Sequence, residues 1–164
     1  MAKKQVSTEQ FSFEALDEKD LAILKVLQLN AKATISDIAK QVHLSGSPVH
    51  ERIRRMEQQG VIKQYATLLD LNKIQKSLIV ICYVSLKEHN KNAGLKFIKR
   101  IQELTEVVEC YSISGEFDFM LKVIARDMER YYDFHVNKLS QAENVGHIQS
   151  VFVMGVVKDT HVVL

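Results

Sequence analysis

The richest concentration of side chains that could do chemistry lies between residues 45 and 63. Hydroxyl, imidazole and guanidinium groups recur there at helical spacing, opposite an apolar stripe. Arginine can form two hydrogen bonds with guanine in the major groove, and Arg, Ser or His can hold phosphates. We expect base contacts from Ser47, His50 and Arg54, phosphate contacts from Ser45 and Arg55, and a wing around Lys63 close by. An amphipathic helix with several arginines is also typical of a solvated face, so the surrounding elements must distinguish the two interpretations.

Residues suited to catalysis or metal binding are scattered through the chain. The six histidines are His43, His50, His89, His135, His147 and His161. None lies at a familiar ligand spacing from another His, a Cys or a carboxylate. No nucleophile motif or glycine-rich phosphate loop is present, and Ser45-Gly46-Ser47 fits helix capping better. The sequence therefore predicts no catalytic residue, no metal site and no cofactor.

A second group of candidate binding residues surrounds the turn at residues 114–118. A free α-amino acid carries an ammonium and a carboxylate, so its receptor needs an acceptor, N–H donors and a side-chain pocket. Gly115 lets the backbone approach a ligand closely. Asp118 or Glu116 could receive the ammonium, and Ser150 could add a hydroxyl. A turn between two strands needs glycine in any case, and the pattern by itself favours that simpler interpretation.

Three helices are predicted to position the first group. They run from Asp17 to about Asn30, from Thr34 to Val42, and from Ser45 or Ser47 to Gly60. Asp17 with Asp20 and Thr34 with Asp37 have the spacing of N-terminal caps. The second and third helices are separated by a turn of three or four residues, which is the spacing of a helix-turn-helix. Val61–Leu69 is predicted to form a short strand pair, or wing.

The second half of the chain has a different periodicity. The predicted strands are Ser77–Leu86, Val107–Ser114, Phe117–Ala125 and Val145–Val157, with helices at Asn92–Leu104 and after Asp127. The order is βαββαβ, which is the ferredoxin-like arrangement. The strands are apolar on both faces, whereas helices cover only one face of such a sheet. We therefore expect a second copy of the chain to cover the other face.

Composition limits the compartment and the partners. A net charge of +2 is too small for a generally basic nucleic-acid coat, so positive charge toward DNA must be local. The polar first residues lack the apolar core of a signal peptide, and no apolar run approaches the roughly 20 residues of a membrane span. We expect a cytoplasmic protein without a membrane partner, in which Cys82 and Cys110 are reduced.

The sequence from Leu16 essentially to the C-terminus resembles the Lrp/AsnC (leucine-responsive/asparagine-responsive, or feast/famine) regulators. The segments that carry the resemblance are LDEKDLAILKVLQ (16–28), ISDIAKQVHLSGSPVHERIRRMEQQGVIKQYATLLD (35–70) and VVECYSISGEFDFMLKV (107–123). The helix-turn-helix combined with the downstream GEFDFMLKV strand is far more specific than either half.

This resemblance implies a fold, a function and an assembly. The fold is α+β, with a flexible tail at 1–15, a winged helix-turn-helix at 16–66, a linker at 67–76 and a ferredoxin-like domain at 77–164. The function is sequence-specific transcription regulation on double-stranded DNA, modulated by a small metabolite such as an amino acid. The assembly is a homodimer formed through the C-terminal domains, with octamers or similar rings built from dimers.

The resemblance also changes the interpretation of the turn, because regulators of this family bind amino acids there, where dimers meet other dimers. The candidate effector-binding residues are Ser114, Gly115, Glu116, Phe117, Asp118, Gln149 and Ser150. Two departures stand out. The family usually has Gly where His43 stands, and Ile148-Gln149-Ser150 keeps only the second hydroxyl of a Thr-x-Thr/Ser pattern. The second departure favours an apolar ligand over a polar one.

Two other functions remain alternatives at this stage. Some proteins that resemble this family in both domains decarboxylate tetrapyrroles, and these would be expected to lose the basic recognition face. The retained Arg54 and Arg55 argue against that activity. An RNA-binding plait would need exposed aromatic residues beside basic ones on its central strands, where this chain has Ile, Val and Cys.

Overall fold

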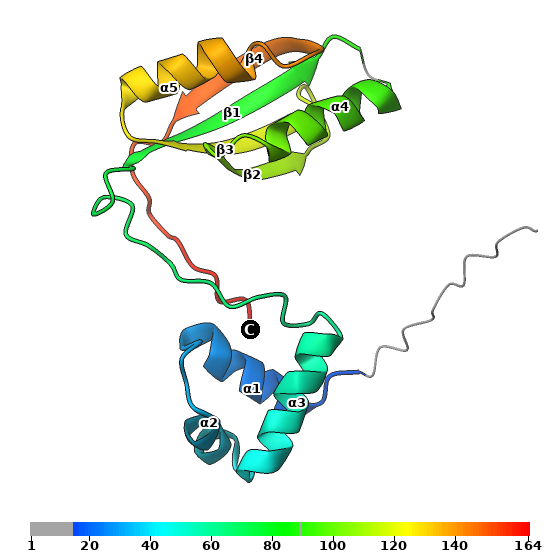
Figure 1. Cartoon of the computed structure of the whole chain (residues 1–164), viewed down its shortest axis with the longest axis vertical. Coiled ribbons are helices and arrows are strands. Elements are labelled where there is room, and N and C mark those ends of the chain that lie inside the picture. Colours follow the sequence, from blue (N-terminus) through cyan, green and yellow to red (C-terminus); the bar gives the residue numbers. More distant parts are fainter. Residues whose placement is uncertain (1–14, 89) are drawn as a thin grey trace, which may run out of the picture. The chain divides into compact units, whose positions relative to one another are not determined.

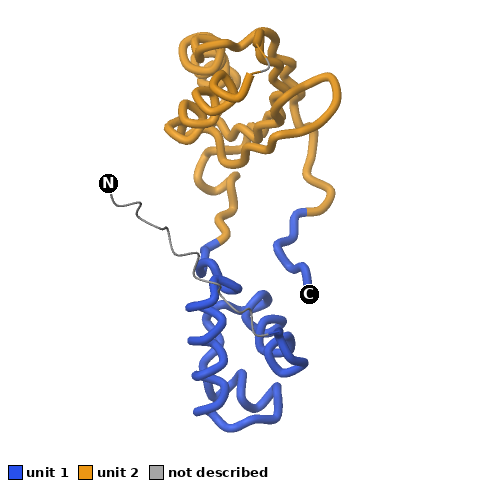
Figure 2. The backbone as a smooth tube through the Cα atoms, turned by 90° about the vertical axis from the view of Figure 1, so that its right-hand side faces the viewer, with its two compact units in different colours: residues 1–67, 159–164 blue, residues 68–158 orange. Residues whose placement is uncertain are grey.

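The computed structural model of the chain describes residues 15–88 and 90–164. It divides into two compact units, which are coloured blue and orange in Figure 2. The first unit comprises the chain up to Thr67 together with Asp159–Leu164, and the second comprises Leu68–Lys158. The tail predicted at residues 1–15 lies outside the described residues except for its last position. Within the described residues, no helix is long and apolar enough to cross a membrane.

In the described part of the N-terminal unit there are three helices: α1 (Glu18–Leu29), α2 (Ile35–Val42) and α3 (Gly46–Gln58) (Figure 1). The predicted N-caps are confirmed, because the Asp17 side chain accepts from the Asp20 N–H and the Thr34 side chain accepts from the Asp37 N–H. The turn between α2 and α3 passes through His43 in the left-handed region, at φ 54° and ψ 54°. Histidine thus replaces the usual glycine while keeping the positive φ that the turn needs.

The core of this unit is small. It consists of the buried residues Ile23, Ile38, Ala39, Val42, Val49, Ile53 and Met56. The stripe predicted on α3, Val49, Ile53 and Met56, is entirely within it. Each helix therefore contributes one apolar side to a single core, which leaves the opposite side of α3 in solvent.

The strand pair predicted at Val61–Leu69 is wrong: this segment contains no strand. A hairpin must reverse direction, and reversal relies on Gly, Pro, Asn or Asp at the turn. None of these residues occurs between Val61 and Leu69, and the first is Asp70. The segment instead runs without ladder hydrogen bonds, although Tyr65 Oη donates to Glu57 Oε1 of α3 at 2.9 Å.

The C-terminal unit is a four-stranded antiparallel sheet with the order β2-β3-β1-β4 (Figure 1). Its elements are β1 (Leu78–Leu86), α4 (Lys91–Gln102), β2 (Val107–Ser112), β3 (Phe119–Ala125), α5 (Met128–Phe134), the π-helix η1 (His135–Leu139) and β4 (Val145–Phe152). The predicted βαββαβ order and ferredoxin-like arrangement are confirmed. The π-helical continuation of α5 is not signalled by any pattern in the sequence.

Several strand boundaries differ from expectation. β2 ends at Ser112 and β3 begins at Phe119, so their connection is a longer turn than the predicted Gly115-Glu116 pair. β4 ends at Phe152 instead of Val157. Its neighbour β1 begins at Leu78, and Val153 N–H donates to Ile79 O at 3.0 Å as the last rung. Beyond that rung, β4 has no partner strand left.

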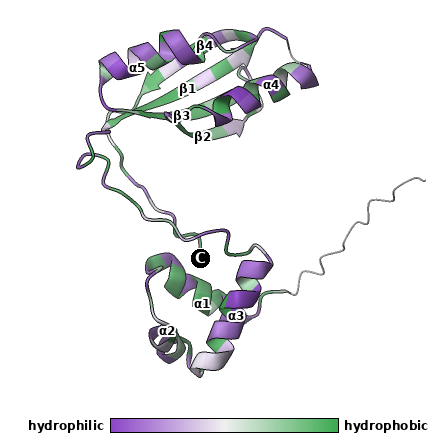
Figure 3. Cartoon of the chain, viewed as in Figure 1, coloured by the Kyte–Doolittle hydropathy of each residue, from purple (hydrophilic) through white to green (hydrophobic). Residues whose placement is uncertain are grey.

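The sheet has two unlike faces. Val80, Cys82 and Val84 of β1 are 0% exposed and pack with α4 and α5, so we call their side the helix face. Ile79, Ile81 and Tyr83 alternate with them on the other side and stay half-buried. We call that side the open face, because no helix of this unit covers it. The predicted apolar character of both faces is confirmed, and Figure 3 shows the central strands as mostly hydrophobic.

Candidate nucleic-acid interface and effector site

The solvent side of α3 carries the predicted base-reading residues. Ser47, His50 and Arg54 recur at intervals of three and four residues and are all exposed, opposite the buried stripe. Ser45, the N-cap residue, is exposed beside them. Figure 3 shows α3 as a largely hydrophilic helix. A helix with one buried stripe and exposed hydroxyl, imidazole and guanidinium groups has the form needed to enter a major groove.

Two other arginines of α3 are engaged inside the unit. Arg52 Nη1 lies 2.8 Å from Asp20 Oδ1 and 2.6 Å from Asp17 Oδ2, and Arg55 Nη2 lies 2.5 Å from Asp20 Oδ2. Asp20 is 0% exposed, whereas the arginine side chains are 26% and 34% exposed. Arg55, for which the sequence predicts a phosphate contact, therefore already has a carboxylate partner. Lys63 follows α3 and is exposed.

The ion pairs affect the ionisation of these groups. The backbone N–H of Asp20, followed by the Arg52 side chain, holds the pKa of the Asp17 carboxyl below its ordinary value. Hydrogen bonds to Asp20 and Asp17 raise the pKa of the Arg52 guanidinium. Sequence reasoning read the two aspartates only as helix caps, because nothing in a single sequence shows which arginines fold against them.

The predicted effector turn folds over one end of the open face. Asp118 N–H donates to Val84 O at 2.9 Å, and the Asp118 carboxylate accepts from Leu86 N–H at 2.7 Å. The hydroxyl of Ser85 donates to Glu116 O at 3.1 Å. Gly115 has a φ of 126°, a conformation that other residues rarely adopt. The turn is therefore tied to the end of β1, and Ser114, Gly115 and Glu116 are left exposed.

Aromatic rings join this turn to the sheet. The Phe117 ring lies 5.4 Å from that of Tyr83 and 6.1 Å from that of His147, between ring centroids. Gln149 stands opposite Tyr83 in the β1–β4 register, so it belongs to the same face. The cluster of Tyr83, Phe117 and His147 was not anticipated, because its members are far apart in the sequence.

Ser150 lies elsewhere. It pairs with Cys82 in the β1–β4 register and so belongs to the helix face, where its hydroxyl shares a 2.5 Å hydrogen bond with the Tyr131 hydroxyl. Tyr131 Oη also lies 3.3 Å from Cys82 Sγ. Burial raises the pKa of both the Tyr131 hydroxyl and the Cys82 thiol. The structure therefore brings Gln149 together with the turn but separates Ser150 from it.

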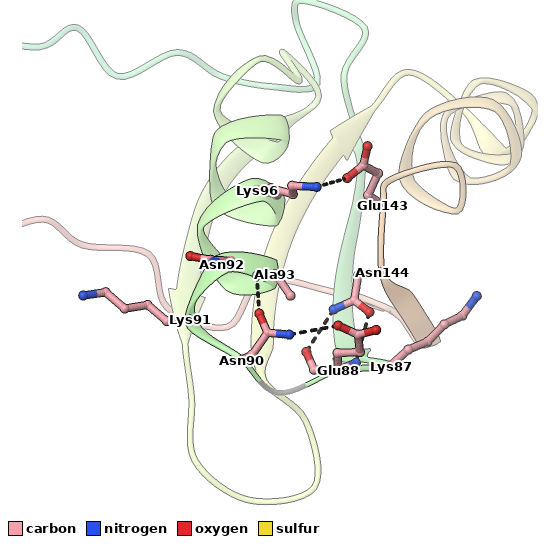
Figure 4. Close-up of a pocket in the computed structure, with 9 residues that line it drawn as sticks. All are labelled: Lys87, Glu88, Asn90, Lys91, Asn92, Ala93, Lys96, Glu143 and Asn144. Atoms are coloured by element: carbon pink, nitrogen blue, oxygen red, sulfur yellow. Dashed lines mark hydrogen bonds and ion pairs between the residues drawn. The ribbon is translucent and has the colours of Figure 1, made fainter.

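A cavity of about 670 Å³ opens near the start of α4 (Figure 4). Several of its polar groups pair with one another: Asn90 Nδ2 donates to Glu88 Oε2 at 2.9 Å, and Lys96 Nζ pairs with Glu143 Oε2 at 2.9 Å. None of the predicted effector residues lines it. Within the described residues, no group of three or more His, Cys, Asp or Glu side chains is arranged to hold a metal ion.

Comparisons with known proteins agree with both halves of this arrangement. A family model described as winged helix-turn-helix DNA-binding matches residues 16–63, and the Lrp/AsnC ligand binding domain matches residues 79–163. The leucine-responsive regulatory protein of Haemophilus influenzae is 35% identical over 98% of this chain and 97% of its own length. The transcriptional regulator AzlB of Bacillus subtilis is 32% identical over 88% of this chain and 92% of its own length.

Solved structures agree with the sequence comparisons. An AsnC family transcriptional regulator from Agrobacterium tumefaciens superposes with a TM-score of 0.86 at 32% identity, covering 91% of this chain and 97% of that one. A transcriptional regulator from Neisseria meningitidis, solved as a complex with L-Met, superposes with a TM-score of 0.85 at 32% identity, covering 90% of this chain and 95% of that one. The exposed recognition helix, the ferredoxin-like unit and these relatives lead to one conclusion: the chain belongs to the Lrp/AsnC family of transcriptional regulators.

Proposed function

We propose that this DNA-binding regulator reads its operator with the exposed side of α3. Ser47, His50 and Arg54 contact base edges, while Ser45 and Lys63 contact phosphates. The observation that carries this proposal is that Ser47, His50 and Arg54 are all exposed opposite the buried stripe of α3. Arg55 is not among the proposed contacts, because it is paired with the buried Asp20.

The test compares Arg54→Ala with Arg100→Ala, which removes an equal charge from the exposed surface of α4. The DNA probes are a duplex that the wild-type protein selects from a random pool and a scrambled duplex of equal composition. Losing a good base contact costs roughly 1–3 kcal/mol, so Arg54→Ala should weaken binding to the selected duplex by about 5- to 150-fold. Scrambled DNA should be affected less, and Arg100→Ala should change neither. Equal losses on both duplexes for Arg54→Ala would reduce its role to a phosphate contact.

The proposed assembly is a dimer formed through the open face of the sheet. Ile79 and Ile81 on β1, with Val151 on β4, give this face an apolar surface that is only partly buried within one chain. Apolar surface of this extent is normally covered in a soluble protein. Two copies related by a two-fold axis present two recognition helices to a palindromic site, with half-sites about one helical turn or a multiple apart. Dimers then associate into octamers or similar rings.

The proposed effector is an apolar amino acid that binds at the turn between β2 and β3. The exposed Gly115 backbone offers the close approach that a carboxylate needs, and Glu116 or Asp118 receives the ammonium. The relatives support an amino acid, since one is named leucine-responsive and another was solved with L-Met. Phe117, Tyr83 and Gln149 offer an apolar and amide surface beside the turn. Binding there alters how dimers associate in the cytoplasm and changes DNA affinity through a coupling free energy.

Calorimetry with the twenty amino acids, L-Leu and L-Met included, tests the effector. A hydrogen bond to a charged group contributes roughly 1.5–3 kcal/mol, so removing the ammonium acceptor should weaken binding about tenfold or more. Glu116→Gln and Asp118→Asn are compared with Ser150→Ala, which lies on the helix face and should leave affinity unchanged. Full affinity in both carboxylate variants would exclude the proposed ammonium contact, and no heat with any amino acid would exclude this class of effector.

A further inference from the structure

Asp20 has an unusual environment for a helix-capping residue. Among the described residues, Asp20 is the only charged side chain that is buried, with 0% of its surface exposed. A buried carboxylate is costly unless it is paired and hydrogen-bonded. Its two oxygens face Arg52 and Arg55, at 2.8 and 2.5 Å, and Oδ2 also accepts from the Asp17 N–H at 3.1 Å. Both guanidinium groups come from α3, the recognition helix.

Capping alone does not require this arrangement, as α2 shows. The Thr34 hydroxyl caps α2 and donates to the Asp37 carboxylate at 2.6 Å. Thr34 and Asp37 are both exposed, and the Asp37 carboxylate is hydrogen-bonded to the Thr34 hydroxyl instead of an arginine. The two acidic residues occupy the same position in successive helices, but only Asp20 is buried against α3. Asp20 therefore has a role that the cap of α2 lacks.

The two arginines flank Arg54 in the sequence and lie on the side of α3 that meets α1. A long, solvated arginine next to a DNA-binding surface can reach phosphates of any sequence. Each phosphate that a protein neutralises steepens the dependence of log K on log salt by about 0.9 and strengthens binding without regard to sequence. Because Arg52 and Arg55 form ion pairs with a buried carboxylate, their guanidinium groups are kept from binding phosphates in this way. These ion pairs also fix the rotation of α3 about its axis relative to α1.

We propose that Asp20 is a positioning residue for DNA discrimination, which holds Arg52 and Arg55 away from phosphates and sets the rotation of α3. Arg54 is then left as the arginine of α3 that reads bases. The consequence is a lower affinity for arbitrary DNA and a higher ratio of specific to nonspecific binding. Asp20 acts through the two arginines and contacts no DNA itself.

Asp20→Asn in the full chain tests this role, because asparagine keeps the size and the acceptor oxygen but loses the charge. Asp37→Asn is the matched control, since it makes the same charge change in the same unit at an exposed residue whose carboxylate is hydrogen-bonded to Thr34. Binding is measured to the selected and scrambled duplexes between 0.05 and 0.5 M salt. For Asp20→Asn we expect affinity for scrambled DNA to rise roughly five- to tenfold per released arginine at 0.1 M salt, and the salt slope to steepen by up to about 1.8. The ratio of selected to scrambled affinity should fall.

A merely structural role would lower both affinities together through the unfolded fraction and would leave the salt slope unchanged, which would overturn the proposal. Equal salt slopes for Asp20→Asn and Asp37→Asn would also overturn it, because the increase in net charge that both variants share would then explain the steeper slope. The triple variant Asp20→Asn/Arg52→Gln/Arg55→Gln should restore the wild-type slope if the released arginines are the cause.

Arg52→Gln keeps the proposal testable if Asp20→Asn does not fold, since the Asp20–Arg55 pair remains. The salt slope of Arg52→Gln should equal that of the wild-type protein, because Arg52 contacts no phosphate in the proposed complex. A slope shallower by about 0.9 would mean that Arg52 binds a phosphate in the wild-type protein, and would refute the proposal.

Discussion

The two units of this regulator are stabilised in different ways. Among the residues that the structure describes, the N-terminal unit buries seven in its apolar cluster, whereas the C-terminal unit buries fifteen. The smaller unit adds a charged network in which two arginines meet one buried carboxylate. The core of the larger unit holds a short polar chain, formed by Cys82, Tyr131 and Ser150, and its ion pairs lie at partly exposed or exposed side chains. Ion pairs therefore join α3 to α1 in the smaller unit, whereas apolar packing between the sheet and its helices dominates the larger one.

This difference has a physical basis. Hydrophobic contact is non-directional. A small apolar core therefore holds a helix in place but restricts its rotation about its own axis only weakly. The hydrogen-bonded ion pairs between Asp20 and two arginines have a defined geometry, which we propose sets this rotation. The sheet of the C-terminal unit has its rotation and register fixed by backbone ladders, so its side chains on the open face are available for association.

The largest effect is expected from a charge on the open face. Ile81→Glu places a carboxylate in the proposed dimer interface, where an unpaired ion costs several kcal/mol. We expect it to abolish the dimer at micromolar concentration, measured by light scattering. The control is Tyr132→Glu on α5, where the side chain is 67% exposed and a charge stays in water. If the Ile81→Glu protein remained a dimer, the open face would not be the dimer interface.

An intermediate effect is expected from truncating one core side chain in each unit. Each truncation should lower the free energy of unfolding of its own unit alone. Phe97 is 1% exposed and stacks with Phe119 at 4.7 Å between ring centroids, and Met56 is 0% exposed. Phe97→Ala should lower the free energy of unfolding of the C-terminal unit by about 3–5 kcal/mol, and Met56→Ala that of the N-terminal unit by about 2–5 kcal/mol. Urea unfolding followed by residue-resolved NMR distinguishes the units. If either variant lowered both transitions equally, the two cores would not be independent.

The smallest effect is expected when the pH is lowered, and it concerns the stability of the two units. Asp17 and Asp37 carboxyls have pKa values below the ordinary 3.8, through hydrogen bonds from the Asp20 N–H and from Thr34 respectively. In the C-terminal unit burial raises the pKa of the Glu106 carboxyl, but the hydrogen bond from Lys138 and further contacts outweigh it, so the net shift from 4.5 is downward. A lowered folded pKa contributes stability above the unfolded value, which is lost as pH falls through the folded value.

Both units should therefore lose stability below about pH 4–5, and the loss in the N-terminal unit should depend on its capping carboxylates. Asp17→Asn should destabilise that unit at pH 7, and its difference from wild type should shrink as the pH approaches 2. Thermal unfolding monitored by NMR of α1–α3 across this range measures the difference. A difference that is independent of pH would show that the charge of Asp17 contributes nothing.

Much of the local structure is determined by the sequence itself. Capping residues and apolar periodicity located α1, α2 and α3, and strand alternation with turn residues located the βαββαβ order, because these signals act over a few neighbouring residues. The exposed side of α3 and the apolar open face followed from the same periodicities. The absence of a turn residue between Val61 and Leu69 also argues against a hairpin there, although the strand pair was predicted.

Only the tertiary structure decided which charged and polar groups meet. It joined Asp20 to Arg52 and Arg55 across more than thirty positions, and it placed Ser150 on the helix face with Tyr131 while leaving Gln149 near the effector turn. It also ended β4 where its neighbour β1 begins. Such pairings depend on how whole elements pack and on strand register, in which a shift of one residue exchanges the two faces of a sheet. Spacing along one chain contains no information of that kind, so the contacts of the turn at residues 114–118 and the arginine network became visible only in the folded molecule.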